Sequence, residues 1–457
     1  MTLLVQYLDT QALSEPTQVD SEESLETLEA YQTLHEAQSH AEGFEAFYET
    51  YRSLEDTERL IELSEGLECL KSLSESIHQA TLSDVKYIHT ATQLALAGTH
   101  LQPQQVFPAL EDSLNGCVST ESIGQMISGI WQSIVKAVKR TWQALRKFFG
   151  YVYDRANKLH TRNDKMRDRF AQVKDHPQAH PEVVLKKEIR YLTCEYKVPR
   201  NARDIERNLK GVHQEAEQLL GQYTQKLIKA GQSITRAIQG YKKEQPEKSI
   251  QAITQAAQEL EMDTLAKRMG ASTTNEGPKL GQGQMYQGKP LTGNQSLFYF
   301  EPNIESSNNN ALYSAEQVRK RQIRLDDTTQ GAKQTLKETR LPTLDYSQAM
   351  DLYEVHRGVL DILIAFKKQE AELVKVQNGL ENAAAQLTRR LESDRNLPET
   401  SRTYYRAAVK FNQAFALWVA HPQSALMKLM LQSVNTSLHY CQLSIGEHKA
   451  PDKADGD

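Results

Sequence analysis

Two pairs of closely spaced histidines are the residues of this 457-residue chain whose type and spacing suggest metal binding. A zincin-type pair needs two histidines four residues apart on a helix, so that both rings reach one ion. His35 and His40 are five positions apart, which favours solvated surface side chains. His176 and His180 have the correct spacing, but a proline follows each of them and disfavours a helix there. The sequence therefore predicts no metal site.

The sequence also contains no recognisable motif for phosphate binding or catalysis. The glycines of "LGQGQMYQG" stand at 281, 283 and 288, which is not the GxGxxG spacing, and we expect a flexible loop there. The sequence has no Walker lysine, no GxSxG motif and no carboxylate pair whose spacing suggests acid–base catalysis. We therefore expect no catalytic residues, no cofactor and no enzymatic activity.

The cysteines and the N-terminal residues indicate the compartment in which the chain is made. Cysteines are few and far apart, which fits a reducing cytosol better than disulfides or zinc: Cys69, Cys117, Cys194 and Cys441. The start, "MTLLVQYLDT", lacks the basic region and the long apolar run of a signal peptide. No stretch approaches eighteen apolar residues, so we expect no transmembrane helix.

Charge is distributed unevenly along the chain. Residues 1–121 contain 22 acidic and 4 basic side chains, a net charge of −18, whereas the remaining residues carry +13. Residues 122–170 alone hold 11 basic and 3 acidic side chains. Such asymmetry indicates segments with different partners. An acidic domain fused to an unrelated one would give the same pattern.

A long amphipathic helix is predicted to start where the charge changes sign, in "SIGQMISGIWQSIVKAVKRTWQALRKFFGYVYDRANKL". Apolar residues recur at helical steps from Ile123 to Val152, and Ser122 with Gln125 matches a capping box. Five basic residues lie largely off the apolar stripe: Lys136, Lys139, Arg140, Arg146 and Lys147. Three interpretations stay open, namely a core helix with a solvated basic face, an interfacial membrane helix, and a helix that meets polyanionic phosphate.

The apolar stripe of this helix is too wide and too aromatic to be left in water. We expect it to pack against the C-terminal helices and to shield Trp142 from solvent. An exposed Trp142 would instead favour the membrane interpretation.

Helical periodicity dominates the rest of the chain, and we expect a mainly α fold of helical bundles with a small β-hairpin or strand element in the middle. Long helices are predicted over 345–393 and 399–445, and shorter ones over 205–227 and 246–269. We divide the chain into an acidic helical region (1–121), the basic helix with a helical region and one strand (122–269), a Gly/Asn-rich linker with a β-hairpin (270–344), and a C-terminal helical hairpin with a tail (345–457).

Two short β elements are predicted. In "EIRYLTCEYKVP" alternating residues precede Pro199 and predict a strand: Leu192, Cys194, Tyr196 and Val198. In "GKPLTGNQSLFYFEP" we expect a hairpin with its turn at Gly293–Asn294 and a strand over Leu297–Phe300.

The tripeptide Ser119-Thr120-Glu121, an acidic helical leader before it and the basic helix after it together resemble the internal head, or inner-body, proteins of giant tailed phages related to phiKZ. In that family a prohead protease cuts after a small-x-Glu tripeptide and removes an acidic propeptide. The resemblance places the scissile bond between Glu121 and Ser122. Other tripeptides end at Glu23, Glu26, Glu55 and Glu111 and fit the same pattern, but the charge changes sign only at Glu121.

The resemblance implies a non-enzymatic protein of the capsid interior, made in the host cytoplasm and packaged in the prohead. Its partners would be the prohead protease, other capsid-interior proteins and packaged double-stranded DNA. The five basic residues would contact the DNA without sequence preference. One alternative is a membrane-active effector that is ejected with the genome and contacts a membrane surface. A second is a bacterial cytosolic structural protein with a permanent acidic domain.

Overall fold

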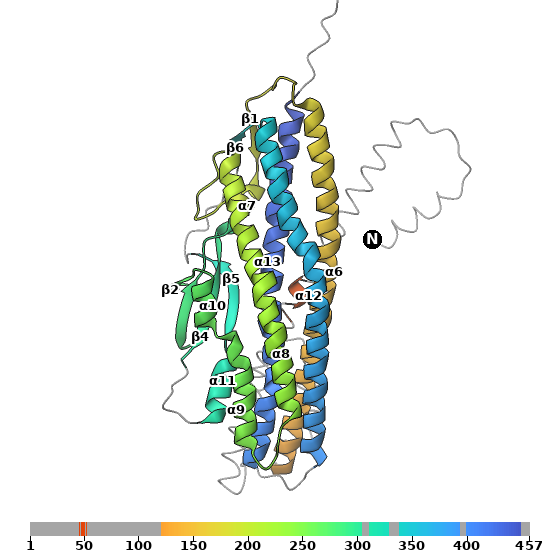
Figure 1. The fold of residues 1–457 in the computed structure, drawn as a ribbon, viewed down its shortest axis with the longest axis vertical. Coiled ribbons are helices and arrows are strands. Elements are labelled where there is room, and N and C mark those ends of the chain that lie inside the picture. The colour runs from red at the N-terminus through yellow and green to blue at the C-terminus, as the bar shows by residue number, and fades with distance from the viewer. Residues whose placement is uncertain are drawn as a thin grey trace, which may run out of the picture. The chain divides into compact units, whose positions relative to one another are not determined.

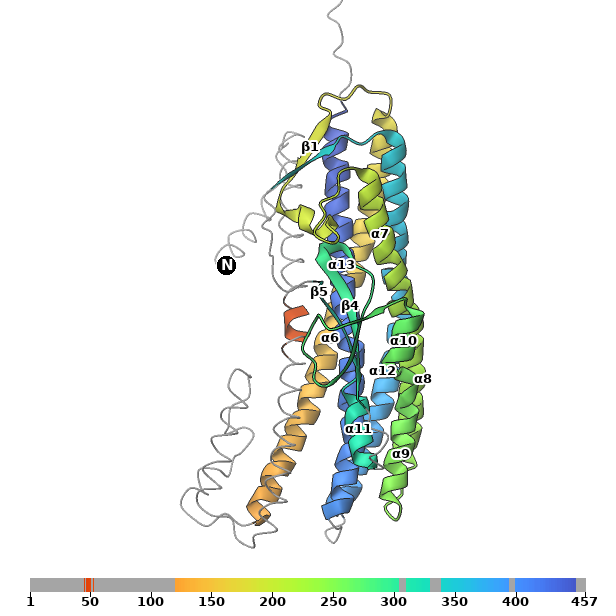
Figure 2. The ribbon, with the colours of Figure 1, turned by 90° about the vertical axis from the view of Figure 1, so that its left-hand side faces the viewer.

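Four long helical stretches lie side by side and make up most of the structure, which confirms the mainly α fold (Figures 1 and 2). The computed structural model describes residues 45, 47–50, 52, 120–303, 310–328, 338–393 and 399–448. The chain divides into two compact units, Met1–Ala46 and Phe47–Asp457, and the contacts described below lie within the second. The predicted division into four segments stays a prediction.

The long stretches include the predicted helical repeats, and two of them run further than the repeats predicted over 123–152 and 205–227. They are α6 (Thr120–Val173), the continuous run of α7 (Ala202–Ala216), the π-helix η2 (Glu217–Tyr223) and α8 (Thr224–Gln239), and the C-terminal helices α12 (Tyr346–Ser393) and α13 (Glu399–Gly446). The bounds of α12 and α13 match the two helices expected over 345–393 and 399–445. Long apolar repeats without an early breaker therefore located these helices correctly.

Helix α13 forms the centre of the bundle. Helices α6, α8 and α12 and one strand of the sheet pack around it. Nearly every described side chain from Tyr405 to Leu438 is buried or half-buried. A helix that is covered on all sides needs apolar residues around its whole circumference, and α13 has them.

Smaller elements cover one side of the bundle (Figure 1). They are η1 (Lys187–Leu192), α9 (Pro246–Ala257), η3 (Gln258–Leu260), α10 (Met262–Arg268), η4 (Thr292–Asn294) and α11 (Ala311–Arg319), with an antiparallel sheet of order β2 (Ser272–Thr274), β3 (Gly283–Gln287), β4 (Gln295–Pro302) and β5 (Gln322–Asp327). Strand β4 is buried from Ser296 to Phe300, so both of its faces are covered. A separate pair, β1 (Glu182–Leu185) and β6 (Thr339–Pro342), joins two of the predicted segments.

One proline lies inside the central helix, and a neighbouring helix compensates for it. Pro422 has no N–H, so the carbonyl of Trp418, four residues earlier, loses its helical donor. The Tyr223 hydroxyl donates a hydrogen bond to that carbonyl at 3.1 Å, and the bond is buried. Tyr223 is the last residue of the π-helical turn. The contact therefore satisfies a backbone group that α13 cannot satisfy by itself.

The strand predicted in "EIRYLTCEYKVP" is wrong. The segment forms the 3-10 helix η1 and then a tight turn in which Cys194 bridges Lys197. Ile189 and Leu192 are both fully buried, and their three-residue spacing is that of a 3-10 turn. Alternation over so few residues does not distinguish this turn from a strand.

The turn predicted at Gly293–Asn294 is confirmed, because both residues have positive φ, 73° and 59°. The strand after it is longer than expected and pairs with β3 and β5. The loop predicted in "LGQGQMYQG" is wrong, since Gly283–Gln287 is strand β3. A Cβ at Gly283 would collide with the backbone carbonyl oxygen of Glu301 and would lie 2.7 Å from the Phe300 ring, so this glycine allows close strand packing.

Candidate functional site

Helix α6 has one buried face and one basic face over its described side chains. The predicted apolar positions Val138, Trp142, Leu145 and Phe149 are all at most 5% exposed. The five predicted basic residues are all exposed on the other side: Lys136, Lys139, Arg140, Arg146 and Lys147. Alternation at helical spacing thus separates cations from the core, as the sequence predicted.

The buried face packs against both C-terminal helices, as expected. The Trp142 ring stacks on Phe415 of α13 with the ring centroids 6.4 Å apart. Phe149 meets Phe366 of α12 edge-on at 5.5 Å. The side chains of Ile127, Ile130, Trp131 and Ile134 lie outside the described residues. Because Trp142 is buried by its own chain, its burial does not support the membrane interpretation.

Two cations of the basic face are paired within the chain. Lys139 lies 3.0 Å from a carboxylate oxygen of Glu381, and Lys147 lies 3.7 Å from one of Glu49. Both lysine side chains are more than half exposed. Exposed ion pairs contribute at most about 1 kcal/mol each, so a phosphate can replace either carboxylate.

The tripeptide that marks the predicted scissile bond lies where α6 begins. Ser119 lies outside the described residues, whereas Thr120, Glu121 and Ser122 are the first residues of the helix. The capping box predicted at Ser122 is therefore wrong. Thr120 and Glu121 are compatible with a helix, and nothing in the sequence forces it to start later. The Glu121–Ser122 peptide bond is thus helical in the uncut chain.

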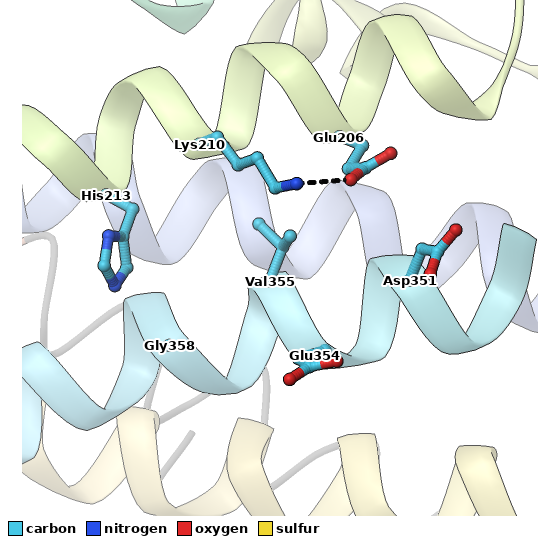
Figure 3. Close-up of a pocket in the computed structure, with 7 residues that line it drawn as sticks. All are labelled: Glu206, Lys210, His213, Asp351, Glu354, Val355 and Gly358. Atoms are coloured by element: carbon cyan, nitrogen blue, oxygen red, sulfur yellow. Dashed lines mark hydrogen bonds and ion pairs between the residues drawn. The ribbon is translucent and has the colours of Figure 1, made fainter.

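A hollow of about 430 Å³ lies between α7 and α12 (Figure 3). Glu206 pairs with Lys210 at 2.6 Å on one side, and Asp351 and Glu354 line the other side. The His213 ring lies over Gly358, where a Cβ would be only 3.1 Å from the ring. The glycine therefore brings the two helices close together. The hollow is lined by charges of both signs, and we assign no ligand to it.

A buried polar layer joins α6, α12 and α13, and the sequence did not reveal it. His356 is fully buried, with Nδ1 3.1 Å from Asn163 Oδ1 and Nε2 2.7 Å from Ser437 Oγ. Asn163 donates its amide N–H to the Tyr353 carbonyl, so its oxygen is left to accept from His356 Nδ1–H. The Ser437 hydroxyl then donates to Nε2. Burial lowers the pKa of His356 to about 3, and the ring is neutral.

Glu215 of α7 is a second buried ionisable group that was not predicted from the sequence. Its side chain is 4% exposed, and Oε2 has no hydrogen-bond partner among the described residues. Burial raises the pKa of Glu215 to about 7, and the positive charge of Lys289 opposes this only partly. Like His356, this residue lies in the core.

Among the described residues, no group of three or more His, Cys, Asp or Glu side chains could hold a metal ion. Burial raises the pKa of Cys441 to about 12, so its thiol is a poor nucleophile. His176 and His180 lie after the end of α6, as the prolines predicted, and His35, His40, Cys69 and Cys117 lie outside the described residues.

Comparison with known proteins identifies the family. The sequence model of phiKZ-like phage internal head proteins matches residues 20–443. No curated protein and no solved structure matches the chain. Among the helices of the described residues, none combines the length and the apolar character that a membrane-spanning helix requires.

The chain belongs to the phiKZ-like phage internal head proteins, because the match covers most of its length. It is a structural protein of the interior of the virion capsid. The resemblance drawn from the tripeptide and the basic helix is thereby confirmed.

Proposed function

We propose that this internal head protein associates with packaged duplex DNA through the basic face of α6. It acts without enzymatic activity and packs among other capsid-interior proteins. The observation that carries the proposal is the exposure of all five predicted cations on one helix whose opposite face is buried. Cations on a rigid, packed helix can replace the counterions of DNA at little cost in conformational entropy.

We propose further that a prohead protease cuts the chain between Glu121 and Ser122 during capsid maturation. The full chain carries −5, whereas the residues after Glu121 carry +13. The cut would therefore change a chain that phosphate repels into one that phosphate attracts. Because this peptide bond is helical in the uncut chain, the protease has to unwind the first turn of α6.

Salt-dependent DNA binding by the cleavage product tests the proposal. We expect the association constant for duplex DNA to fall steeply with salt and to depend little on sequence. We expect replacement of all five cations of the basic face by glutamine to reduce the magnitude of the slope of log K against log salt by about 3–4, if most of them neutralise phosphates. These cations are Lys136, Lys139, Arg140, Arg146 and Lys147.

The matched control replaces five exposed cations on other parts of the molecule: Arg203, Lys229, Lys242, Lys248 and Lys279. It changes the net charge by the same amount, so a specific contact through α6 predicts a much smaller change of slope. Equal slopes for the two sets would show that only net charge matters and would contradict the proposed interface.

A membrane surface remains the second candidate partner of this face. Vesicles with anionic headgroups, tested with the same two sets of variants, distinguish it from DNA. Binding to vesicles but not to duplex DNA would favour the effector alternative.

A further inference from the structure

One turn of the acidic leader packs on the bundle between α6 and α13. This leader turn, Phe47–Thr50, is drawn in red beside α6 in Figure 2. Phe47 is 9% exposed and Thr50 is fully buried. The Phe47 ring lies 5.6 Å from the ring of Phe148, which is itself buried in α6. An aromatic side chain of the leader thus closes over an aromatic side chain of the basic helix.

The leader turn also contacts two cations. The ammonium group of Lys428, on α13, lies 4.0 Å from the centroid of the Phe47 ring and 5.5 Å from that of Tyr48. Glu49 of the same turn pairs with Lys147 at 3.7 Å. The leader turn therefore offers ring faces to the ammonium group of Lys428 and a carboxylate to that of Lys147.

Burial lowers the pKa of Lys428, and the positive charge of Arg190 adds to the effect. Loss of the leader turn would take the Phe47 and Tyr48 rings away from the Lys428 ammonium group and release Lys147 from Glu49. The same step would expose the Phe148 ring. When the leader turn leaves, the residues beneath it lose the Glu49 carboxylate, and their surroundings become more positive.

We propose that the leader turn is a removable cover over a DNA-contact surface formed by Lys147, Phe148 and Lys428. This surface extends the basic face of α6 across to α13, and the phosphate backbone of duplex DNA is its ligand. Charge complementarity supports this ligand, because the cover presents a carboxylate where a phosphate would lie. The inference rests on the proposed function, since it takes DNA as the partner of the cleaved chain.

Two single variants of the full chain test the cover. Phe47→Ala removes the anchoring ring, and Tyr48→Ala removes a neighbouring ring that is 58% exposed. Hydrogen exchange of the amides of residues 47–50 reports whether the turn stays docked. We expect faster exchange in Phe47→Ala and a much smaller change in Tyr48→Ala. Unchanged exchange in Phe47→Ala would overturn the anchoring role of this ring.

Binding of the same full-length variants to a duplex of random sequence tests the surface beneath. We expect Phe47→Ala to bind more tightly than the unmodified chain, with a salt slope steeper by about 1–2 because up to two more phosphates are neutralised. Adding Lys428→Gln should remove part of this gain, whereas adding Lys229→Gln, an exposed lysine on α8, should leave it.

Other outcomes separate the two proposals. Faster exchange without any gain in DNA binding would overturn the surface if the cleaved chain itself binds DNA through the basic face. If the cleaved chain fails to bind DNA, the proposed function fails, and the exchange data still decide whether Phe47 anchors the turn. Self-association of Phe47→Ala in sedimentation, with no gain in DNA binding, would assign the surface to a second copy and overturn the DNA assignment.

Discussion

His356 and Glu215 are buried ionisable side chains whose pKa values are displaced in opposite directions. Burial lowers the pKa of His356 from 6.5 to about 3 and raises that of Glu215 from 4.5 to about 7. Both groups are therefore neutral in the folded protein over a pH range in which the unfolded chain would charge them. Each must make the stability of the bundle depend on pH.

The two contributions oppose each other between pH 4.5 and pH 6.5. In this window the unfolded chain protonates His356 and the folded chain does not, so stability rises with pH. The folded chain keeps Glu215 protonated while the unfolded chain ionises it, so stability falls with pH. Each slope approaches about 1.4 kcal/mol per pH unit at most, and together they nearly cancel.

Single substitutions should separate the two opposing contributions to the pH dependence of the unfolding free energy. In His356→Gln the free energy of unfolding should fall as the pH rises from 4.5 to 6.5, and in Glu215→Gln it should rise. Denaturant titrations of the full chain at several pH values measure both. Ser437→Ala is the control, because it removes a hydrogen bond to His356 and leaves the ring. It should lower stability and keep the unmodified pH dependence, whereas parallel curves for all variants would contradict the assigned shifts.

At the scale of elements, the contact between the π-helical turn and α13 couples Tyr223 to Pro422. Tyr223→Phe should leave the buried Trp418 carbonyl without its donor and lower stability by about 1–3 kcal/mol. In a Pro422→Ala background residue 422 regains an N–H for that carbonyl, so the same substitution should cost much less. Denaturant unfolding of the four chains gives the coupling energy. Additive effects would show that the tyrosine does not compensate for the proline.

The elements differ in how well the sequence predicts them, and the reason is physical. Helices α12 and α13 could be predicted because their apolar repeats continue over many turns. The strand predicted in 188–199 failed because a 3-10 turn also places Ile189 and Leu192 on one buried side. Strand β3 was missed because Gly283 was taken as a loop residue, although its missing side chain makes room for Phe300.

The candidate site was likewise predicted from the sequence only in part. Helical spacing predicted which face of α6 is basic and which is buried, because both follow from the position of each residue around the helix. It could not predict that Phe47 meets Phe148 and Lys428, since such a contact depends on tertiary packing. Likewise, His356 lies four residues from Leu352 and from Leu360, on the core face. That position predicts burial but does not predict its partners Asn163 and Ser437.

For the whole molecule, the uneven charge and the docked leader turn point to the same sequence of events. In the proposed sequence the acidic leader accompanies the bundle during assembly, with Glu49 paired to Lys147 and the rings of Phe47 and Tyr48 against Lys428. The proposed cleavage after Glu121 would then separate −18 from +13 and remove the leader turn in the same step. If the leader is removed in this way, it is absent from mature heads.

The N-terminus of the chain in purified mature virions tests this expectation most directly. Peptide mapping and intact-mass measurement should find a chain that begins at Ser122, with the peptide containing Phe47 absent. Particles arrested before maturation, analysed in the same way, should contain the full chain. Mature heads that contain chains with Phe47–Thr50 still attached to the basic helix would contradict the account.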